Sequence, residues 1–345
     1  MRLVKIEEAV RGNIVAKTLN STGGTTLIRA GAILTDKMIE LIKVRGFSYL
    51  YIEDESNIEV VEDVVRQELR LEAIGDIQKL TVAIIAAKIS LSRDLYSHLL
   101  NIINLLVKDL SANTITIINL IDLKNHDDYT FVHSVNVTIL CLMVGISLGY
   151  PTSTLKELGM GAILHDVGKK EISSDILNKT SQLTKEEYDI IKQHPQIGYE
   201  KVKNVLELGA VGRSVILQHH EKLDGTGYPA GKKVDSIHEF ARIATIADVY
   251  DALTSDRPYR KRYTPSHALE YLYGACGSHF DLRLVKIFAD HIAPYPVGCR
   301  IKLSSGESAI VSDISANRYR PIVRVGKNQI DLCKQLNTTI IDVLM

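Results

Sequence analysis

The sequence has no excess charge of either sign, no low-complexity tract and few cysteines. Its 345 residues include 41 basic and 41 acidic side chains, so the overall composition does not indicate a partner such as a nucleic acid polymer or a membrane surface. The cysteines, Cys141, Cys276, Cys299 and Cys333, lie far apart and form no CxxC motif. This spacing favours a reduced, cytoplasmic protein over a disulfide framework.

The sequence also lacks an export signal and a long apolar run. Charged residues are present throughout MRLVKIEEAV, where a signal peptide would carry its apolar segment. The longest uncharged stretch, residues 134–155, is interrupted by Asn136, Gly145, Gly149 and Pro151. Its apolar part is shorter than a bilayer requires. We therefore expect a buried helix in this region and no membrane span.

The pattern of apolar residues divides the chain into four parts. Residues 1–60 alternate apolar runs with turn signals and predict a small α/β module, a candidate regulatory unit, in which one helix begins after Thr35 and ends at Gly46. Residues 61–112 predict connector helices that either pack on the next domain or pair with a second chain. A homodimer through the module or these helices is one expectation.

The second half of the chain changes pattern once. Residues 113–293 read almost entirely as helix, and residues 294–345 predict a C-terminal β appendage with Gly306 and Gly326 at turns. The predicted fold class is therefore mainly α, with an all-helical central domain between the α/β module and the β appendage.

Seven side chains suited to binding metal fall within the helical part. They are His133, His165, Asp166, His194, His219, His220 and Asp248. A single histidine in a helix is more often structural than a ligand, but imidazoles grouped with carboxylates suit transition metals.

The local sequence around these residues favours the metal interpretation. His165 and Asp166 follow an apolar helix that we expect Gly168 to end, and burying such polar groups is costly without a partner. Asp248 lies close to the apolar face formed by Ile243 and Ile246. The alternative is that Asp248 and its neighbour Asp251 only cap or hydrogen-bond nearby backbone.

The adjacent histidines His219 and His220 open the segment HHEKLDGTGYP. Gly225 and Gly227 permit a tight turn and a close backbone approach, so this segment predicts a loop beside the metals. Tyr228 is expected to line the pocket or to contact a signalling partner protein, and Glu221 to stabilise the loop without binding metal. The alternative is an ordinary glycine-rich turn.

Three segments, HDVGK, QHHEKLDGTGYP and ADVYDALTSDRPYR, together resemble the HD-GYP family of the HD superfamily of metal-dependent phosphohydrolases. The resemblance covers roughly residues 128–293. It implies an all-helical catalytic domain that hydrolyses the bacterial second messenger cyclic di-GMP. It also implies that one metal is held by His133, His165, Asp166 and Asp248, and a second by His194, His219 and His220, with Asp166 bridging the two.

The same resemblance bears on the number of metals and their identity. Members with three metals carry a glutamate one helical turn before the position of His133, where this sequence has Tyr129. Two divalent transition-metal ions are therefore expected. Iron or manganese is the first expectation, with zinc, nickel or cobalt as alternatives.

Two such ions, about 3.5–4 Å apart, hold a hydroxide that attacks phosphorus in line with the leaving ribose oxygen. Lys169 is placed after Asp166 to neutralise charge on the phosphate, unless it is only a solvated surface charge.

The resemblance assigns Arg257 and Arg260 to the phosphate and guanine of the ligand, which suits the planar guanidinium. Gly227 and Tyr228 complete the expected substrate contacts. Read only as a charge run, DRPYRKR is an exposed loop or a short basic patch.

The predicted function is a phosphodiesterase that converts cyclic di-GMP to linear pGpG and, by a second cleavage, to GMP. Another nucleotide, including a hybrid cyclic dinucleotide, is the alternative substrate, because the metal site does not select the base. A third interpretation is a module that senses cyclic di-GMP with little turnover.

Overall fold

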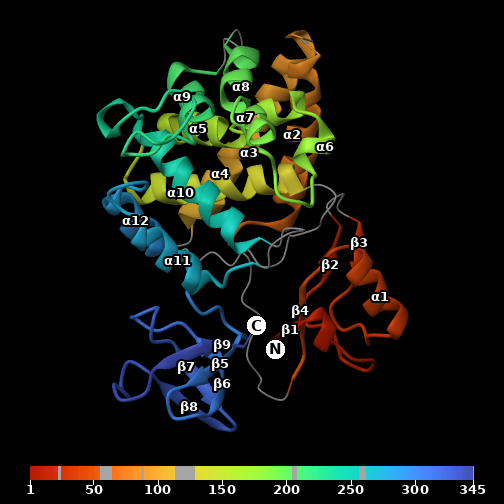
Figure 1. The fold of residues 1–345 in the computed structure, drawn as a ribbon. Coiled ribbons are helices and arrows are strands. Elements are labelled where there is room, and N and C mark those ends of the chain that lie inside the picture. Colours follow the sequence, from red (N-terminus) through yellow and green to blue (C-terminus); the bar gives the residue numbers. More distant parts are fainter. Residues whose placement is uncertain are drawn as a thin grey trace.

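The computed structural model describes residues 1–21, 25–54, 64–86, 89–112, 129–203, 208–255 and 262–344, without the side chains of residues 89–92 and 129. The protein is mainly α, as predicted, with helices α2–α12 gathered in one body and the strands in two smaller parts, one of which also holds α1 (Figure 1). The described helices are α1 (Asp36–Val44), α2 (Gln67–Ile85), α3 (Ile89–Ala112), α4 (Tyr129–Ser147), α5 (Thr152–Ile163), α6 (Ser174–Leu177), α7 (Lys185–Ile191), α8 (His194–Val202), α9 (Ala210–Gln218), α10 (Glu239–Thr254), α11 (Pro265–Gly274) and α12 (Leu282–Ala289). The described strands are β1 (Arg2–Lys5), β2 (Leu19–Asn20), β3 (Thr26–Ile28), β4 (Tyr49–Ile52), β5 (Arg300–Leu303), β6 (Ser308–Asp313), β7 (Ile322–Val325), β8 (Asn328–Asp331) and β9 (Ile340–Val343).

The N-terminal strands and α1 form a small α/β module. Strand β1 pairs antiparallel with β4, and β2 pairs antiparallel with β3. Helix α1 begins as predicted, because the Thr35 side chain accepts a hydrogen bond from the Met38 amide at 3.3 Å. It is followed by Gly46, whose φ of 77° is in the left-handed region that glycine tolerates.

Helices α2 and α3 pack on the central helices. Buried residues of both, including Leu80 and Leu106, belong to the same apolar core as residues of α4, α5, α9, α10, α11 and α12. These two helices therefore pack on the helices that follow them, and pairing with a second chain stays a prediction.

Helix α4 runs through the middle of this core. By length and composition its window Thr130–Ser147 is apolar enough to cross a membrane, contrary to the length argument made from the sequence. In the structure, however, 83% of that window is buried inside the protein. The predicted buried helix is thus confirmed, and its burial carries His133 into the interior.

The C-terminal strands form a five-stranded antiparallel sheet in the order β8-β7-β6-β5-β9. Gly306 and Gly326 have φ values of 90° and 57°, in agreement with the predicted turns. The Leu3 amide donates to the Gly298 carbonyl at 3.0 Å, which joins the N-terminal module to the segment that leads into this sheet.

Candidate metal centre

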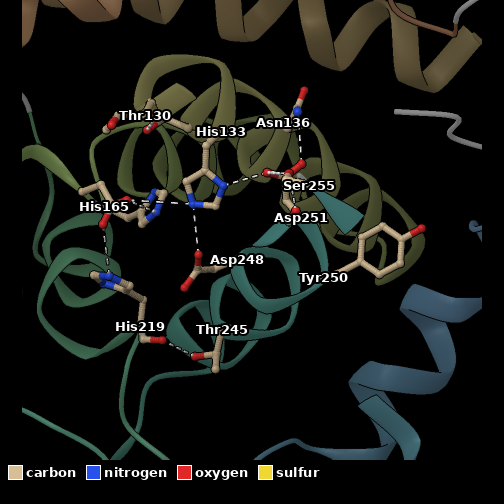
Figure 2. Close-up of polar contacts among 12 residues, drawn as sticks. Thr130, His133, Asn136, His165, His219, Thr245, Asp248, Tyr250, Asp251 and Ser255 are labelled. Carbon is tan, nitrogen blue, oxygen red and sulfur yellow. Dashed lines mark hydrogen bonds and ion pairs between the residues drawn. The ribbon is translucent and has the colours of Figure 1, made fainter. Parts of the chain in front are cut away.

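The seven predicted ligands converge in the interior of the helical body. His133 comes from α4, His165 from the turn after α5, and Asp248 from α10 (Figure 2). Asp166 follows His165 in the same turn, and these two residues form the HD pair. His194 begins α8, and His219 and His220 follow α9.

Two groups of potential ligands have Asp166 in common. Donor atoms lie within 4.8 Å of one another in each group, one formed by His133, His165 and Asp166 and the other by Asp166, His194, His219 and His220. Asp248 adjoins both: its Oδ1 lies 3.0 Å from His133 Nε2, and its Oδ2 lies 3.9 Å from His220 Nδ1. Asp166 is therefore the carboxylate common to both groups, and its bridging role stays a prediction.

The turn that presents the HD pair differs from the prediction. Helix α5 ends at Ile163, before His165, so Gly168 does not end it. Gly168 lies instead in a 3-10 turn, Val167–Glu171, where a Cβ atom would lie 2.1 Å from the carbonyl oxygen of His194. Glycine is required there because the turn and α8 approach each other closely.

Backbone carbonyls fix the orientation of three of the histidines. The Nδ1 atoms of His165 and His194 each lie 2.7 Å from a carbonyl oxygen, and that of His219 lies 3.0 Å from one. The acceptors are, in that order, Ala162, Ile191 and Ile216. A carbonyl only accepts, so each Nδ1 carries the hydrogen and each Nε2 directs a lone pair inward.

The inward-facing atoms fit a cation. His165 Nε2 and Asp166 Oδ1 are buried without a hydrogen-bond partner, and His194 Nε2 lies 3.2 Å from His219 Nε2. Two lone pairs at that distance repel each other unless a positive charge is shared between them. Buried polar atoms of this kind are costly when unpartnered, whereas they are suitable ligands for a divalent transition metal.

The protonation states also suit metal binding. Burial alone would raise the pKa of the Asp166 carboxyl, but the neighbouring His165 imidazole and the ammonium group of Lys169 lower it well below its usual range. Burial similarly opposes ionisation of Asp248, and contact with His133 outweighs it, so that this pKa is also lowered. Burial lowers the pKa of His194 and His219, and it lowers that of His220 to about 3. Ionised carboxylates and neutral imidazoles are the forms that bind metal.

Lys169 is part of this cluster. Its Nζ lies 2.6 Å from Asp166 Oδ2, and its side chain is 27% exposed. The interpretation of Lys169 as a solvated surface charge is therefore wrong, since the ammonium group pairs with the buried carboxylate. Arg257 and Arg260 lie outside the described residues, as does the side chain of Tyr129.

The loop after His220 is held by a buried carboxylate. Glu221 accepts hydrogen bonds from the amides of Ala230 and Lys232, both at 2.8 Å, which agrees with its predicted role in the loop. Gly227 allows the close approach expected of it, because a Cβ there would lie 2.3 Å from the Lys222 amide nitrogen. The Tyr228 ring stacks on His220 with centroids 4.7 Å apart, so this tyrosine lines the cluster.

The role of a further carboxylate, Asp251, was underestimated from the sequence. Asp251, read as a possible backbone cap, accepts from His133 Nδ1 at 2.7 Å and from Asn136 Nδ2 at 3.1 Å (Figure 2). The signal was its spacing: residues three apart lie on the same face of a helix, so Asp251 follows Asp248 toward α4.

Similar proteins support this description. A family model described as an HD domain matches residues 114–284. The chain is 36% identical over 210 residues to the protein named cyclic di-GMP phosphodiesterase PA4108 of Pseudomonas aeruginosa, covering 60% of this chain and 50% of that protein. It is 34% identical over 163 residues to the 3'3'-cGAMP-specific phosphodiesterase 2 of Vibrio cholerae, covering 47% of this chain and 31% of that protein.

The fold has a solved counterpart. The structure of Bd1817, an HDG"Y"P protein from Bdellovibrio bacteriovorus, superposes with a TM-score of 0.55 at 18% identity, covering 84% of this chain and 98% of that one. At this identity the likeness concerns the fold alone. The chain spans half or less of the length of the two named phosphodiesterases.

Proposed function

We propose that the HD domain matched by residues 114–284 is of the HD-GYP type and hydrolyses cyclic di-GMP to linear pGpG and, by a second cleavage, to GMP. The observation that carries the proposal is the convergence of six ligand side chains in two groups that share Asp166, with Asp248 as a seventh beside both groups. The similarity to a protein named cyclic di-GMP phosphodiesterase in Pseudomonas aeruginosa supports the choice of substrate.

In this proposal the seven side chains hold two metal ions, and Asp166 contributes to both. His133, His165, Asp166 and Asp248 hold one divalent ion, and Asp166, His194, His219 and His220 hold the other. When bound, such ions activate a water molecule and neutralise the charge of a phosphodiester. The residues themselves remain fixed, because backbone carbonyls already orient three of the imidazoles.

Lys169 is proposed to bind the phosphate beside the metals. Its side chain is partly exposed while its ammonium group pairs with Asp166, so it can reach a ligand without leaving the cluster. Positive charge at that point stabilises the charge that develops on the phosphate oxygens as the water oxygen bonds to phosphorus and the ribose oxygen departs. Arg257 and Arg260 are proposed to bind the ligand's phosphate and guanine, and Gly227 and Tyr228 to line the same pocket.

A hybrid cyclic dinucleotide is the second candidate substrate. The similarity to a 3'3'-cGAMP-specific phosphodiesterase favours it, and the ligand cluster does not distinguish bases. A sensing role without turnover is less well supported, because all seven ligand positions are filled by residues able to bind metal.

The test is anaerobic hydrolysis with iron or manganese supplied, comparing cyclic di-GMP with 3'3'-cGAMP and separating the products by chromatography. We expect pGpG or GMP from the wild type and neither from Asp166→Ala, which should lose metal and activity together. Asp313→Ala, an exposed aspartate of the C-terminal sheet, is the matched control and should behave as wild type. Turnover by metal-replete Asp166→Ala contradicts the assignment, and binding without turnover by the wild type selects the sensing role.

The metal count tests the proposed stoichiometry. Elemental analysis of the purified chain should give about two ions per chain, since Tyr129 stands where three-metal members of the HD-GYP family carry a glutamate. The variant Tyr129→Glu is the one expected to admit another ion. A wild-type count near three contradicts the two-metal centre.

A further inference from the structure

Four histidines have Nε2 atoms within 4 Å of Asp166. Among these four, only His133 has its Nδ1 hydrogen-bonded to a side chain. The rings of His165, His194 and His219 donate to backbone carbonyls near helix ends, where such carbonyls have no helical partner. His133 lies inside α4, where carbonyls of the preceding turn are used by the helix. The acceptor for its Nδ1 comes instead from another element.

Asp251 of α10 is that acceptor. Its Oδ2 lies 2.7 Å from His133 Nδ1, and the two side chains are 1% and 3% exposed. The carboxylate is itself fixed, because Asn136 donates to Oδ1 at 3.1 Å and Ser255 Oγ lies 3.4 Å from Oδ2 (Figure 2). The imidazole is thus oriented from outside the cluster by a buried, hydrogen-bonded group.

We infer that Asp251 is a positioning residue for the metal centre, an inference that rests on the proposed function of His133 as a ligand. By accepting the hydrogen of Nδ1, Asp251 selects the tautomer whose Nε2 lone pair faces Asp166 and Asp248, and the negative charge increases the basicity of that nitrogen. It also ties α4 to α10, the two helices that contribute ligands to the same group.

The variant Asp251→Asn tests this, because the amide has the size of the carboxylate but places an NH2 group toward either His133 or Asn136. Facing His133, it favours the hydrogen on Nε2, the wrong atom for metal binding. We expect manganese or cobalt to bind about 10–100-fold more weakly at one site in full-length protein, with the other site little changed. The d–d absorption of the cobalt-loaded protein should lose the contribution of that site.

The tautomer itself is a readout that needs neither metal nor turnover. Long-range proton–nitrogen NMR of chelator-treated, full-length protein should show a hydrogen on His133 Nδ1 in the wild type and its loss from Nδ1 in Asp251→Asn. The hydrogen on Nδ1 is the readout, because Nε2 also lies 3.0 Å from Asp248 Oδ1. The resonance is assigned by its loss in His133→Gln. A wild-type His133 without a hydrogen on Nδ1 overturns the inference even if the variant fails to fold.

The matched control is Asp281→Asn, the same chemical change at a carboxylate that pairs with Arg242 at 2.9 Å and caps α12. It should lower stability without changing metal affinity. Equal metal affinities in Asp251→Asn and wild type overturn the inference. Failure of the proposed function gives a different result from failure of this inference. If the His133 tautomer and the metal affinity are as expected but cyclic di-GMP is not turned over, only the proposed substrate is wrong.

Discussion

At the scale of single residues, Gly168 determines how closely the HD turn approaches α8. A Cβ atom there would lie 2.1 Å from the His194 carbonyl oxygen and 2.6 Å from the Gly198 amide nitrogen. Both are backbone atoms, which cannot rotate away as the end of a side chain can. A larger residue must therefore move the turn that carries Asp166 or the helix that carries His194.

Gly168→Ala is expected to lower the free energy of unfolding by about 1–3 kcal/mol, as other overpacked sites do. It should also weaken metal binding, because the two ligand-bearing segments separate. Urea unfolding and elemental analysis measure these effects. Gly75→Ala in α2 is the control, since a Cβ there meets no atom within 4 Å and should be neutral or stabilising by about 0.5–1 kcal/mol. If Gly168→Ala matches wild type in both measurements, the close approach is not required.

The candidate ligands were predictable from the sequence, whereas the contacts that hold them in place were only partly predictable. His165, Asp166 and Asp248 follow or interrupt apolar helices, and this pattern by itself indicates buried polar groups. The contact between Asp251 and His133 joins residues far apart in the chain, and Gly168 meets α8 only after folding. Spacing within α10 indicates that Asp251 shares a face with Asp248, but it does not identify His133 as the partner of Asp251 or α8 as the neighbour of Gly168.

At the scale of elements, α10 supplies both Asp248 and Asp251, so the anchoring of its first turn affects the centre. Glu239, the first residue of α10, accepts hydrogen bonds from Tyr150 and Arg283. Burial would raise the pKa of this carboxyl, but the Tyr150 hydroxyl and the Arg283 guanidinium together lower it below its usual value of 4.5. The ionised form is therefore the stabilising one.

The variant Glu239→Gln gives a pH test of that anchor. A carboxyl whose pKa is lower in the folded state stabilises the protein fully above its unfolded pKa and loses this contribution as pH falls through the folded value. Wild type should therefore be more stable than Glu239→Gln by about 1 kcal/mol at pH 7, with the difference shrinking below about pH 4.5. Urea unfolding from pH 7 to pH 3.5 measures it. A difference that grows on acidification contradicts the role of the ionised carboxylate.

Local signals predicted the helices better than the strands. Thr35 and Gly46 bound α1 as expected, because caps act within a few residues. Strand pairing has no such local signal: β1 pairs with β4, whose residues lie 44 to 50 positions later in the chain (Lys5 with Tyr49, Arg2 with Ile52). Strand β9 likewise pairs with β5 and not with its neighbour in sequence, β8.

At the scale of the whole molecule, the N-terminal module contacts the helical body close to the predicted ligand-binding segment. The guanidinium carbon of Arg262 lies 3.6 Å from the ring centroid of Tyr49, a residue of β4. Arg262 directly follows the segment that contains Arg257 and Arg260. This contact is therefore the place at which to test the regulatory role expected of the module.

A double-mutant cycle on Tyr49 and Arg262 tests this coupling. Cation–π contacts contribute about 0.5–2 kcal/mol, so Tyr49→Ala and Arg262→Ala should each destabilise the chain, and their combination should be less destabilising than the sum by about 1 kcal/mol. Tyr49→Phe keeps the ring face and should resemble wild type. If the module also regulates the site, Tyr49→Ala should raise KM for cyclic di-GMP while metal content stays at the wild-type value. Additive losses of stability would show that the two residues touch without coupling, and the module would then need another route to the metal centre.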